Sequence, residues 1–560
     1  MSFSDPHPEL APARSSSEKH RSEKEDDGIE VASQVDLSRV VSNPGGAPTE
    51  TVSALGRHVG WLSVIFLNIN NMIGTGVFST PGSLLAGLGS PGLVLVFWLI
   101  GIVISYAGLA LYLELASMFP KRAGAEVVYL EQAYRRPKYF FPAAFAAITV
   151  ILEFSASNSI VLANYLLYAS GNDTRYSKFF RSPTEWLTRG IAVAGYTVAS
   201  ALVLSSTKWS LRFVNLVGFL KTVTLVFIAI TGFVVLGGHT RVKDPHVNFH
   251  DAFKGSTHSG NAIATSLVKI NFAFSGYTNS INLINEIKNP VATVRSASSA
   301  ALGLVSVLYV LANVAYFAAV PAATIKTSGT LVAGLFFTNV FGRHAGARVF
   351  PALVSLSAFG NLMAHQEKPP LAIRHGQSRV IREVARQGIL PYPAIWVSTR
   401  PFGTPLFPVF LKWLLTVIVI IAPPAGDAFV FLVDLQSYPA NVFSFATAAA
   451  VFILRRRRKR EGLPRHEYHA WNIALIFTCL VNVFLLVMPW YPPPGGRDGG
   501  DVTFWYATYC AVGLGVLAVA FLYWAAWIVV IPKIRGYRLV EETVVLPDGS
   551  AYNHLTKVFY

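Results

Sequence analysis

Charged residues are scarce in this sequence. They make up 14% of its 560 residues, whereas a soluble globular domain contains about a quarter. The apolar residues gather in blocks of roughly 20, which is the length of helix that crosses the hydrocarbon core of a bilayer. The composition therefore excludes a large soluble protein and predicts an all-α polytopic membrane protein.

Cysteines and the usual signatures of enzyme chemistry are also nearly absent. The two cysteines, Cys479 and Cys510, both lie in apolar segments. This excludes a disulfide framework and a cysteine metal site, and it fits small buried side chains. We find no paired carboxylates, nucleophile elbow or metal-ligand cluster. We therefore expect no enzyme activity, no cofactor and no bound metal.

The N-terminal region lacks the apolar stretch that a cleavable signal peptide needs. Residues 1–58 are polar and rich in Ser, Pro, Glu and Lys, which predicts a disordered cytosolic tail. Residues 532–560 are predicted to form a second cytosolic tail. Because Lys19 and Lys24 suit ubiquitin attachment, we expect ubiquitin-ligase adaptors as partners of the tails.

Positive charge is in excess, with a net charge of +16. Most basic residues lie in loops on one side of the apolar blocks, most clearly in the run from Arg455 to Arg460, and the loops on the other side hold few. Since loops rich in Lys and Arg stay in the cytosol, we expect a multi-pass plasma-membrane protein with both termini in the cytosol. The run fits an anchor on anionic lipids better than a nuclear signal, and no nucleic acid partner is expected.

Twelve apolar blocks can be placed, and together they define a transmembrane domain at residues 59–531. They lie near residues 60–86, 91–119, 139–170, 187–206, 211–237, 262–286, 296–320, 346–366, 405–423, 427–454, 471–489 and 503–531. The segment 321–345 between two blocks is mildly apolar, and we expect a long loop there with room for a short helix.

Two of these blocks contain residues that interrupt a transmembrane helix. Residues 70–76 read NNMIGTG in the first block, and residues 272–279 read FAFSGYTN in the sixth. A membrane tolerates unpaired backbone groups only where they are buried in protein or line a cavity. Each break is therefore predicted to border a substrate site.

The two interrupted blocks open two segments of five blocks each, near residues 60–237 and 262–454. Because five is odd, the second segment enters the membrane with the opposite polarity. Matched breaks in two inverted halves are typical of an inverted-repeat transporter with a site at the membrane midplane. The last two blocks, at residues 471–531, are additional to the repeats.

Five short motifs resemble a known family of membrane proteins. Residues 73–78 (IGTGVF), 272–277 (FAFSGY) and 285–290 (NEIKNP) resemble the amino acid–polyamine–organocation superfamily. Residues 121–134 (KRAGAEVVYLEQAY) and 400–405 (RPFGTP) resemble its fungal high-affinity methionine permeases, which are related to the L-type amino acid transporters. The resemblance covers about residues 57–535. It implies a leucine-transporter fold with a 5+5 inverted repeat plus two extra helices, and transport of a free amino acid.

The first break is predicted to bind the substrate carboxylate. A helix that restarts there presents free N–H groups and a partial positive charge. We expect the carboxylate on the N–H groups of Thr75, Gly76 and Val77, because glycine at 74 and 76 lets the backbone approach a ligand. The alternative for the glycines is close helix packing.

The substrate ammonium is predicted to meet carbonyl groups freed at the breaks. The candidates are the carbonyls of Met72, Ile73, Phe272 and Phe274. The resemblance further implies that Phe272 is an aromatic gate over the substrate.

The substrate side chain needs an apolar pocket. Its candidate residues are Phe272, Phe274, Ser275 and Gly276 at the second break, Asn158 with Ser155 to Ser157, and Ser357, Phe359, Gly360 and Asn361. Packing or hydrogen bonding between helices is the alternative for each. No opposing charge accompanies these residues, which favours a neutral side chain, and the thioether of methionine fits such surroundings.

Ionisable residues inside membrane blocks are functional by default. The resemblance implies that Lys221 stands where sodium-driven relatives hold a sodium ion. It would tie the fifth helix to the first or carry the coupling proton, and both roles stay open. Glu153 is a second candidate, whereas Lys269 is expected to extend toward the outer membrane surface.

One segment departs from the resembled family. Residues 365–375 contain two prolines and five ionisable side chains where the family continues its eighth helix, and such residues would break that helix. The segment is either a genuine longer inner loop or a gene-prediction artefact such as a retained intron.

These observations predict a secondary transporter that imports methionine or a similar neutral L-amino acid by alternating access. We expect a proton as the coupling ion, and membrane lipids around the protein. The alternatives are a broad neutral amino acid permease or exchanger, and a nutrient receptor that signals through its tails. A channel is disfavoured because no repeated pore motif is present.

Overall fold

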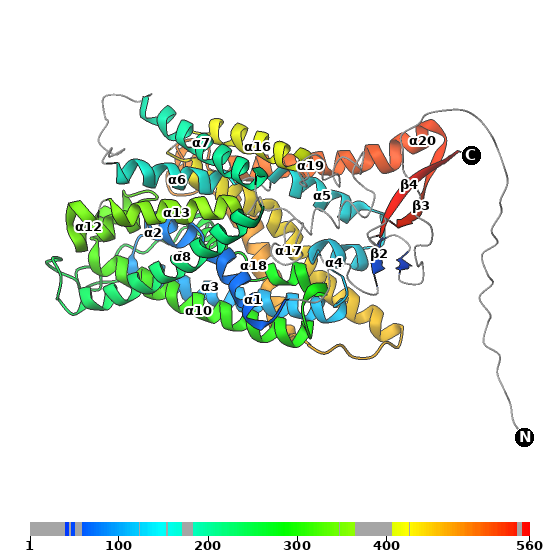
Figure 1. Ribbon diagram of the computed structural model, residues 1–560, viewed down its shortest axis with the longest axis horizontal. Helices are drawn as coiled ribbons and strands as arrows, with labels where there is room; N and C mark the ends of the chain where they lie inside the picture. The colour runs from blue at the N-terminus through cyan, green and yellow to red at the C-terminus, as the bar shows by residue number, and fades with distance from the viewer. Residues whose placement is uncertain are drawn as a thin grey trace, which may run out of the picture. The chain divides into compact units, whose positions relative to one another are not determined.

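Apolar helices form most of the described chain, as the computed structural model shows (Figure 1). The structure describes residues 40–43, 46–50, 59–122, 124–152, 155–170, 183–205, 207–346, 348–364, 406–424, 426–545 and 551–559. The predictions for Lys19, Lys24 and Glu153, and for the segment 365–375, lie outside these residues.

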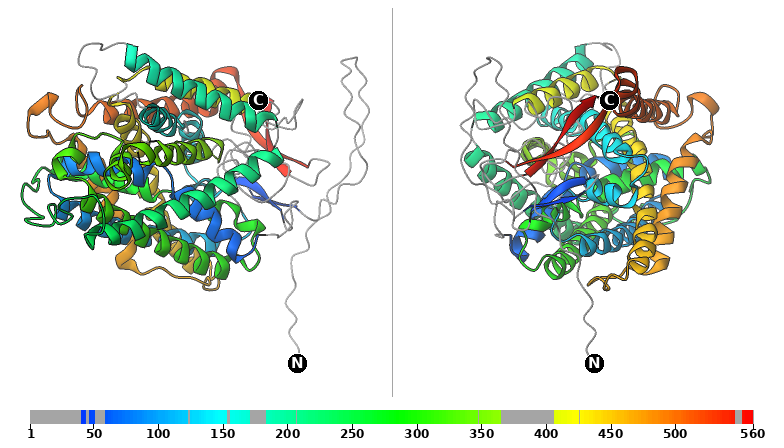
Figure 2. Two further views of the ribbon diagram at one scale, coloured as in Figure 1. Left: turned by 60° about the vertical axis from the view of Figure 1, so that its left-hand side comes forward. Right: turned by 90° about the vertical axis from the view of Figure 1, so that its right-hand side faces the viewer.

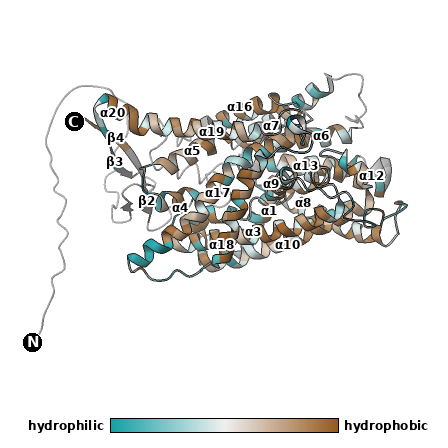
Figure 3. Cartoon of the chain, turned by 180° about the vertical axis from the view of Figure 1, so that it is seen from behind, coloured by the Kyte–Doolittle hydropathy of each residue, from teal (hydrophilic) through white to brown (hydrophobic). Residues whose placement is uncertain are grey.

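The described helices have the lengths and the surfaces of membrane-spanning segments. Seven are long and apolar enough to cross a membrane, and a bent pair of helices raises the number to eight. Large apolar side chains point outward, such as Leu480 and Leu522, which are 63% and 62% exposed. Hydrophobic residues accordingly colour much of the helical ribbon (Figure 3). Because such a surface is unfavourable in water, the chain is a multi-pass membrane protein.

The bent pair consists of α1 (Trp61–Met72) and α2 (Gly76–Leu88), and the predicted first break lies between them. Their axes differ by 42°. The second predicted break follows α9 (Gly260–Phe274) and precedes the 3₁₀ helix η2 (Asn279–Glu286). There Gly276 has a φ of +109°, a conformation that glycine adopts without the steric cost of a side chain. Both predicted interruptions are thus confirmed as breaks in helical structure.

The other helices surround these two broken elements. They are α3 (Pro91–Met118), α4 (Glu126–Ala133), α5 (Phe140–Leu152), α6 (Ala156–Ala169), α7 (Pro183–Ser205), α8 (Thr207–Leu236), α10 (Pro290–Ala319), α11 (Ala322–Lys326), α12 (Val332–Ala345), α13 (Val349–Ala364), α16 (Leu406–Ile421), α17 (Ala428–Arg460), α18 (Asn472–Val487), α19 (Thr508–Trp524) and α20 (Ile531–Arg535). Helix α2 packs against α9, and α1 packs against α10. These contacts hold the two breaks next to each other in the centre of the helical bundle.

The segment 321–345 contains more helix than expected. Helices α11 and α12 occupy most of it. The ring of Phe337 in α12 stacks on Phe350 of α13, with 4.4 Å between the ring centroids. Burial of this aromatic face explains why a mildly apolar sequence folds as a helix.

Short strands lie in both segments that were predicted to be tails. Strands β1 (Val40–Asn43) and β2 (Gly46–Glu50) form one antiparallel hairpin. Strands β3 (Tyr537–Val545) and β4 (Ala551–Phe559) form a second, longer hairpin. Strand β2 contacts β4, so segments from both ends of the chain lie side by side (Figure 2).

Candidate functional site

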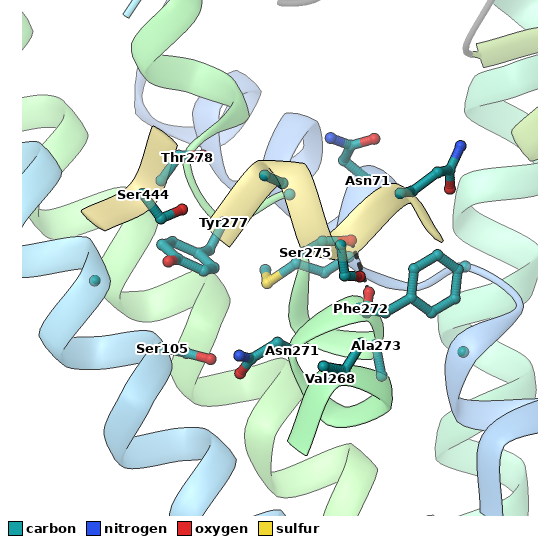
Figure 4. Close-up of a pocket in the computed structure, with 18 of the residues that line it drawn as sticks. Asn71, Ser105, Val268, Asn271, Phe272, Ala273, Ser275, Tyr277, Thr278 and Ser444 are labelled. Carbon is teal, nitrogen blue, oxygen red and sulfur yellow. Dashed lines mark hydrogen bonds between the residues drawn. The ribbon is translucent and has the colours of Figure 1, made fainter. Parts of the chain in front are cut away.

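A cavity of about 490 Å³ lies where the two broken helices meet. Its walls come from the two breaks, from α3, α6, α17 and α18, and from single residues of α5 and α13, Leu152 and Asn361. Figure 4 shows Asn71 of the first helix and the labelled residues 271–278 around this space. The lining includes Gly74, Thr75, Gly76, Asn158, Phe272, Ser275 and Gly276, all of which the sequence predicts as site residues. The volume suits a small ligand such as an amino acid.

The first break places backbone N–H groups at the start of α2, where Thr75 and Gly76 line the cavity. The N–H of Ser79 donates to the carbonyl of Thr75 over 3.0 Å, which closes the first turn of α2. The N–H groups of Thr75, Gly76 and Val77 precede that bond, and such groups at a helix start have no partner within the helix. Together with the helix dipole they can bind an anion.

Close packing of α2 on α9 places the N–H groups beside the second break. A Cβ atom built on Gly76 would lie 2.8 Å from Cα of Ala273. No side chain is accommodated at that distance without a backbone shift. Glycine at 76 therefore serves the packing of the two broken helices. It also lines the cavity, and carboxylate binding there stays a prediction.

Thr75 is held by a partner that the sequence could not assign. Its hydroxyl donates to Oδ1 of Asn158 on α6 over 2.9 Å, and both side chains are buried. The bond orients the start of α2 against α6. Asn158 and Thr75 thus form one polar corner of the cavity.

Tyr309 of α10 connects the two breaks. Its hydroxyl lies 2.6 Å from the Met72 carbonyl and 3.1 Å from the Ala273 carbonyl, so one O–H donor is shared between the broken helices. The ring is fully buried against Trp98, with 5.5 Å between centroids. Sequence reasoning missed this residue, because a Tyr in the middle of an apolar block gives no sign of which backbone it reaches.

Two of the predicted ammonium acceptors already have partners. The Met72 carbonyl accepts from the Gly74 N–H over 2.8 Å as well as from Tyr309. The Phe272 carbonyl accepts from the N–H and the hydroxyl of Ser275, over 3.2 and 2.7 Å (Figure 4). A carbonyl oxygen has two lone pairs, so the carbonyls of Ile73 and Phe274 are the better candidates among the four.

Four predicted site residues lie behind the cavity wall. Ile73, Val77 and Phe274 are fully buried, and none of them is among the residues that line the cavity. Phe274 instead packs edge-on against Trp98 at 5.7 Å between centroids. Phe359 of α13 packs edge-on against a phenylalanine of α8, at 6.0 Å. The side chains of Phe274 and Phe359 therefore do not line the pocket as expected.

Phe272 lies at the cavity and also contacts α17. Its ring lies edge-on to Phe429, with 6.2 Å between centroids. In Figure 4 the ring points away from Asn271, its neighbour on α9. Helices α9 and α17 therefore meet at this pair. The role of Phe272 as a gate stays a prediction.

The opposite wall of the cavity was not predicted. It consists of Ser105, Gly108 and Tyr112 of α3, Gln436, Ser437, Asn441 and Ser444 of α17, and Thr478 and Asn482 of α18. Most of these residues are polar, and they are spaced through apolar blocks. Polar residues within such a block were the available signal, but the same pattern also arises from hydrogen bonds between helices.

Lys221 of α8 is buried, with 4% of its surface exposed. Its Nζ donates to the carbonyl of Asn70 over 2.5 Å and to Oδ1 of Asn361 over 2.8 Å. Both acceptors are uncharged. The contacts join α8 to the end of α1 and to α13, next to the first break.

Lys269 does not extend toward the membrane surface as expected. It is buried in α9, donates to Asp501 and lies 3.9 Å from Asp434 of α17. The sequence could not reveal this cluster, because its three residues lie in segments far apart along the chain. The two carboxylates attract the buried ammonium and stabilise it in place of water.

One described group of side chains has the composition of a metal site. Ligand atoms of Glu114, His466 and His469 lie within 4.8 Å of one another. However, Arg455 already donates to both Glu114 oxygens, each over 2.6 Å. Burial lowers the pKa of His466, so this imidazole is uncharged at neutral pH. A guanidinium on the carboxylate would repel a cation, and the cluster is better explained as a link between α3, α17 and the following loop.

Comparison with known proteins gives one family and several related transporters. The sequence profile of the amino acid permease family matches residues 59–530. The chain is 33% identical to the high-affinity methionine permease of Saccharomyces cerevisiae, over 90% of this chain and 84% of that protein. It is 28% identical to the low-affinity methionine permease of the same yeast, over 88% and 86%. It is 25% identical to the human cystine/glutamate transporter, over 81% and 84%.

Proposed function

The chain belongs to the amino acid permease family, and from this premise we propose that it imports methionine or a similar neutral L-amino acid across the plasma membrane. The relatives are transporters and not enzymes. The observation that carries the proposal is the cavity between two broken helices, with the free N–H groups of α2 at its edge. The proposed substrate has the carboxylate and ammonium that these breaks suit.

The backbone of the substrate binds at the two breaks. Its carboxylate accepts from the N–H groups of Thr75, Gly76 and Val77, beside the cavity residue Gly74. Its ammonium donates to the carbonyls of Ile73 and Phe274. The opposite ends of two half-helices thus bind opposite charges, as the helix dipole favours.

The substrate side chain extends into the remainder of the cavity. Phe272, Ser275, Gly276 and Asn158 border this space. Among the described lining residues no side chain is charged, which favours a neutral substrate because a buried charge without a partner is costly. An unbranched, polarizable thioether adapts well to such a wall.

The helices support an arrangement of two inverted repeats. The first repeat consists of α1–α2, α3, α5–α6, α7 and α8, within residues 60–237. The second consists of α9–η2, α10, α13, α16 and α17, within residues 262–454. Helices α18 and α19 complete a set of about twelve spans. Each repeat then begins with a broken helix, as expected for a transporter with a site at its midplane.

Transport proceeds by alternating access and is coupled to the entry of protons. Phe272 closes the cavity toward the outer side through its contact with α17. Lys221 acts as a tether of the first break, since both of its acceptors are uncharged. The tails at 1–58 and 532–560 face the cytosol and are available to ubiquitin-ligase adaptors, while lipids cover the apolar surface of residues 59–531.

The test is uptake of radiolabelled methionine by cells that lack their own methionine permease. We expect saturable uptake that a protonophore abolishes and that other neutral amino acids inhibit less than unlabelled methionine does. Absence of uptake, with the protein confirmed at the cell surface, would contradict the proposal. Stronger inhibition by leucine would favour a broad neutral permease or exchanger. A nutrient response without any uptake would favour a receptor.

A further inference from the structure

A buried cluster of three charged side chains lies beside the cavity. Lys269 of α9 donates to Asp501, which lies in the loop between α18 and α19. Its Nζ is also 3.9 Å from Oδ2 of Asp434 in α17. The side chains of Lys269 and Asp434 are 2% and 1% exposed, and that of Asp501 is 25% exposed. None of the three lines the cavity or has a role in the substrate site.

The cluster does not balance its charge. One ammonium faces two carboxylates, so the fully ionised cluster has a net charge of −1. A buried charge without compensation is strongly unfavourable. Neither carboxylate oxygen of Asp434 has a hydrogen-bond partner within the described chain. One added proton would neutralise the cluster, and Asp434 is the carboxylate with less support for a negative charge.

The surroundings of Asp434 supply no second positive charge from the described residues. Its titratable neighbours are Lys269, Asp501, and Tyr509 and Cys510 of α19. The last two are neutral as ordinary side chains and become negative when they ionise. They therefore cannot replace the missing positive charge.

The cluster spans the helices that meet at the outer side of the cavity. On α9, Lys269 lies between the cavity residues Val268 and Asn271, one turn before Phe272. On α17, Asp434 lies between Phe429, which contacts Phe272, and the cavity residue Gln436. Contact between α9 and α17 therefore buries the cluster and brings the gate residues together.

We propose that Asp434 carries the coupling proton, with Lys269 and Asp501 setting the charge balance that makes the proton necessary. This inference rests on the proposed function. A proton from the outside adds to a carboxylate oxygen of Asp434 while α9 and α17 are apart. Closure then buries a neutral cluster. The proton leaves the same oxygen when water reaches α17 from the inner side through the cavity.

The net charge of the cluster predicts an unusual pattern of transport activity among variants. Either D434N or D501N leaves one ammonium and one carboxylate, which is neutral without a proton. Each single variant should therefore transport methionine without dependence on pH. The double variant leaves the ammonium alone, and closure would bury a positive charge. It should lose transport at every pH, although each single change permits it.

The experiment uses purified full-length protein in liposomes and radiolabelled methionine. Uptake by the wild type should fall by about tenfold per pH unit as the outer pH rises above its midpoint, as one required proton dictates. D434N and D501N should change by less than about twofold over the same range. Both should still exchange internal for external methionine but should not accumulate it against a gradient.

A matched control is D427N, the same change at the start of α17. Asp427 accepts from the N–H of Thr503 over 2.8 Å and so ties the same loop to the same helix, outside the cluster. Its variant should keep the pH profile of the wild type. If uptake by D427N lost its pH dependence to the same extent, the proposal would be overturned. The effect would then come from the lost attachment of the loop alone.

The remaining outcomes separate this inference from the proposed function. No methionine transport by the wild type would refute the proposed function itself. Methionine exchange by the wild type without pH dependence would leave the function standing and overturn the proton carrier. Retained pH dependence in D434N would also overturn it. If D434N does not fold, D501N provides the test. A wild-type pH profile in D501N would contradict the claim that the charge balance of the cluster makes the proton necessary.

Discussion

Gly76 shows how one residue can serve both packing and binding. Replacing it with alanine places a methyl group 2.8 Å from Cα of Ala273. The resulting separation of α2 and α9 would move the N–H groups away from the ammonium acceptors. We expect G76A to lose at least about fivefold in methionine uptake per molecule at the cell surface, since overpacking costs about 1–3 kcal/mol.

The control for Gly76 is G515A in α19. A Cβ atom there has no neighbouring atom within 4 Å, so uptake should stay at the wild-type level. Normal uptake by G76A would contradict the role of this contact in the substrate site.

Tyr309 is the second residue on which the site depends. The change Y309F removes one hydroxyl and leaves the carbonyls of Met72 and Ala273 without their shared donor. An unsatisfied buried polar group costs about 1–3 kcal/mol. We therefore expect uptake to fall by about 5- to 150-fold, measured as initial rate against methionine concentration.

Tyr106 offers the matched comparison for Tyr309. Its hydroxyl also donates to a backbone carbonyl of α10, that of Ser299 over 3.1 Å, but the side chain is exposed. Y106F should therefore have little effect. Equal losses in the two variants would show that the bond between the broken helices has no special importance.

At the scale of the elements, Lys221 joins three helices at the first break. The change K221M leaves the Asn70 carbonyl and the Asn361 side chain without their donor. We expect the unfolding temperature of the purified protein to fall by several degrees, as a loss of about 1–3 kcal/mol implies. Methionine uptake should be low at all pH values. Rapid uptake that no longer depends on pH would instead identify Lys221 as the proton carrier.

The two broken helices were predictable because their sequences conflict with their surroundings. Asn and Gly within an apolar block, as at Asn71 and Gly276, signal that a continuous helix is not formed. The N–H groups of α2 follow directly from the helix restart at Gly76. Local sequence therefore predicted one half of the candidate site, which consists of backbone groups.

The other half depends on contacts between distant segments. Tyr309 reaches two carbonyls from α10, and Asn158 reaches Thr75 from α6. Lys269 was expected at the membrane surface because its two acidic partners lie 165 and 232 residues further along the chain. Helical periodicity could not give these pairs, since it determines which residues share a face and not which helices meet. The hairpin of β3 and β4 was likewise not predicted, because the sequence of a polar tail did not show which of its segments pair.

At the scale of the whole molecule, the apolar surface and the buried polar centre follow from the same physical requirement. Helices with exposed leucines require lipid, and lipid requires that broken backbone be enclosed by protein. The chain encloses both breaks around one cavity and surrounds that cavity with uncharged side chains. The charged cluster at Lys269 lies outside the cavity. If the two proposals hold, variants should therefore disrupt substrate recognition and proton coupling separately.

The central claim is that the two breaks bind the carboxylate and the ammonium of an amino acid. It is tested most directly by competition for radiolabelled methionine binding to the purified protein, using methionine, its decarboxylated amine and its deaminated acid. Each charge-assisted hydrogen bond contributes about 1.5–3 kcal/mol, and several are lost with either group. We therefore expect both analogues to bind at least about 100-fold more weakly than methionine. Binding of either analogue within about threefold of methionine would contradict the claim.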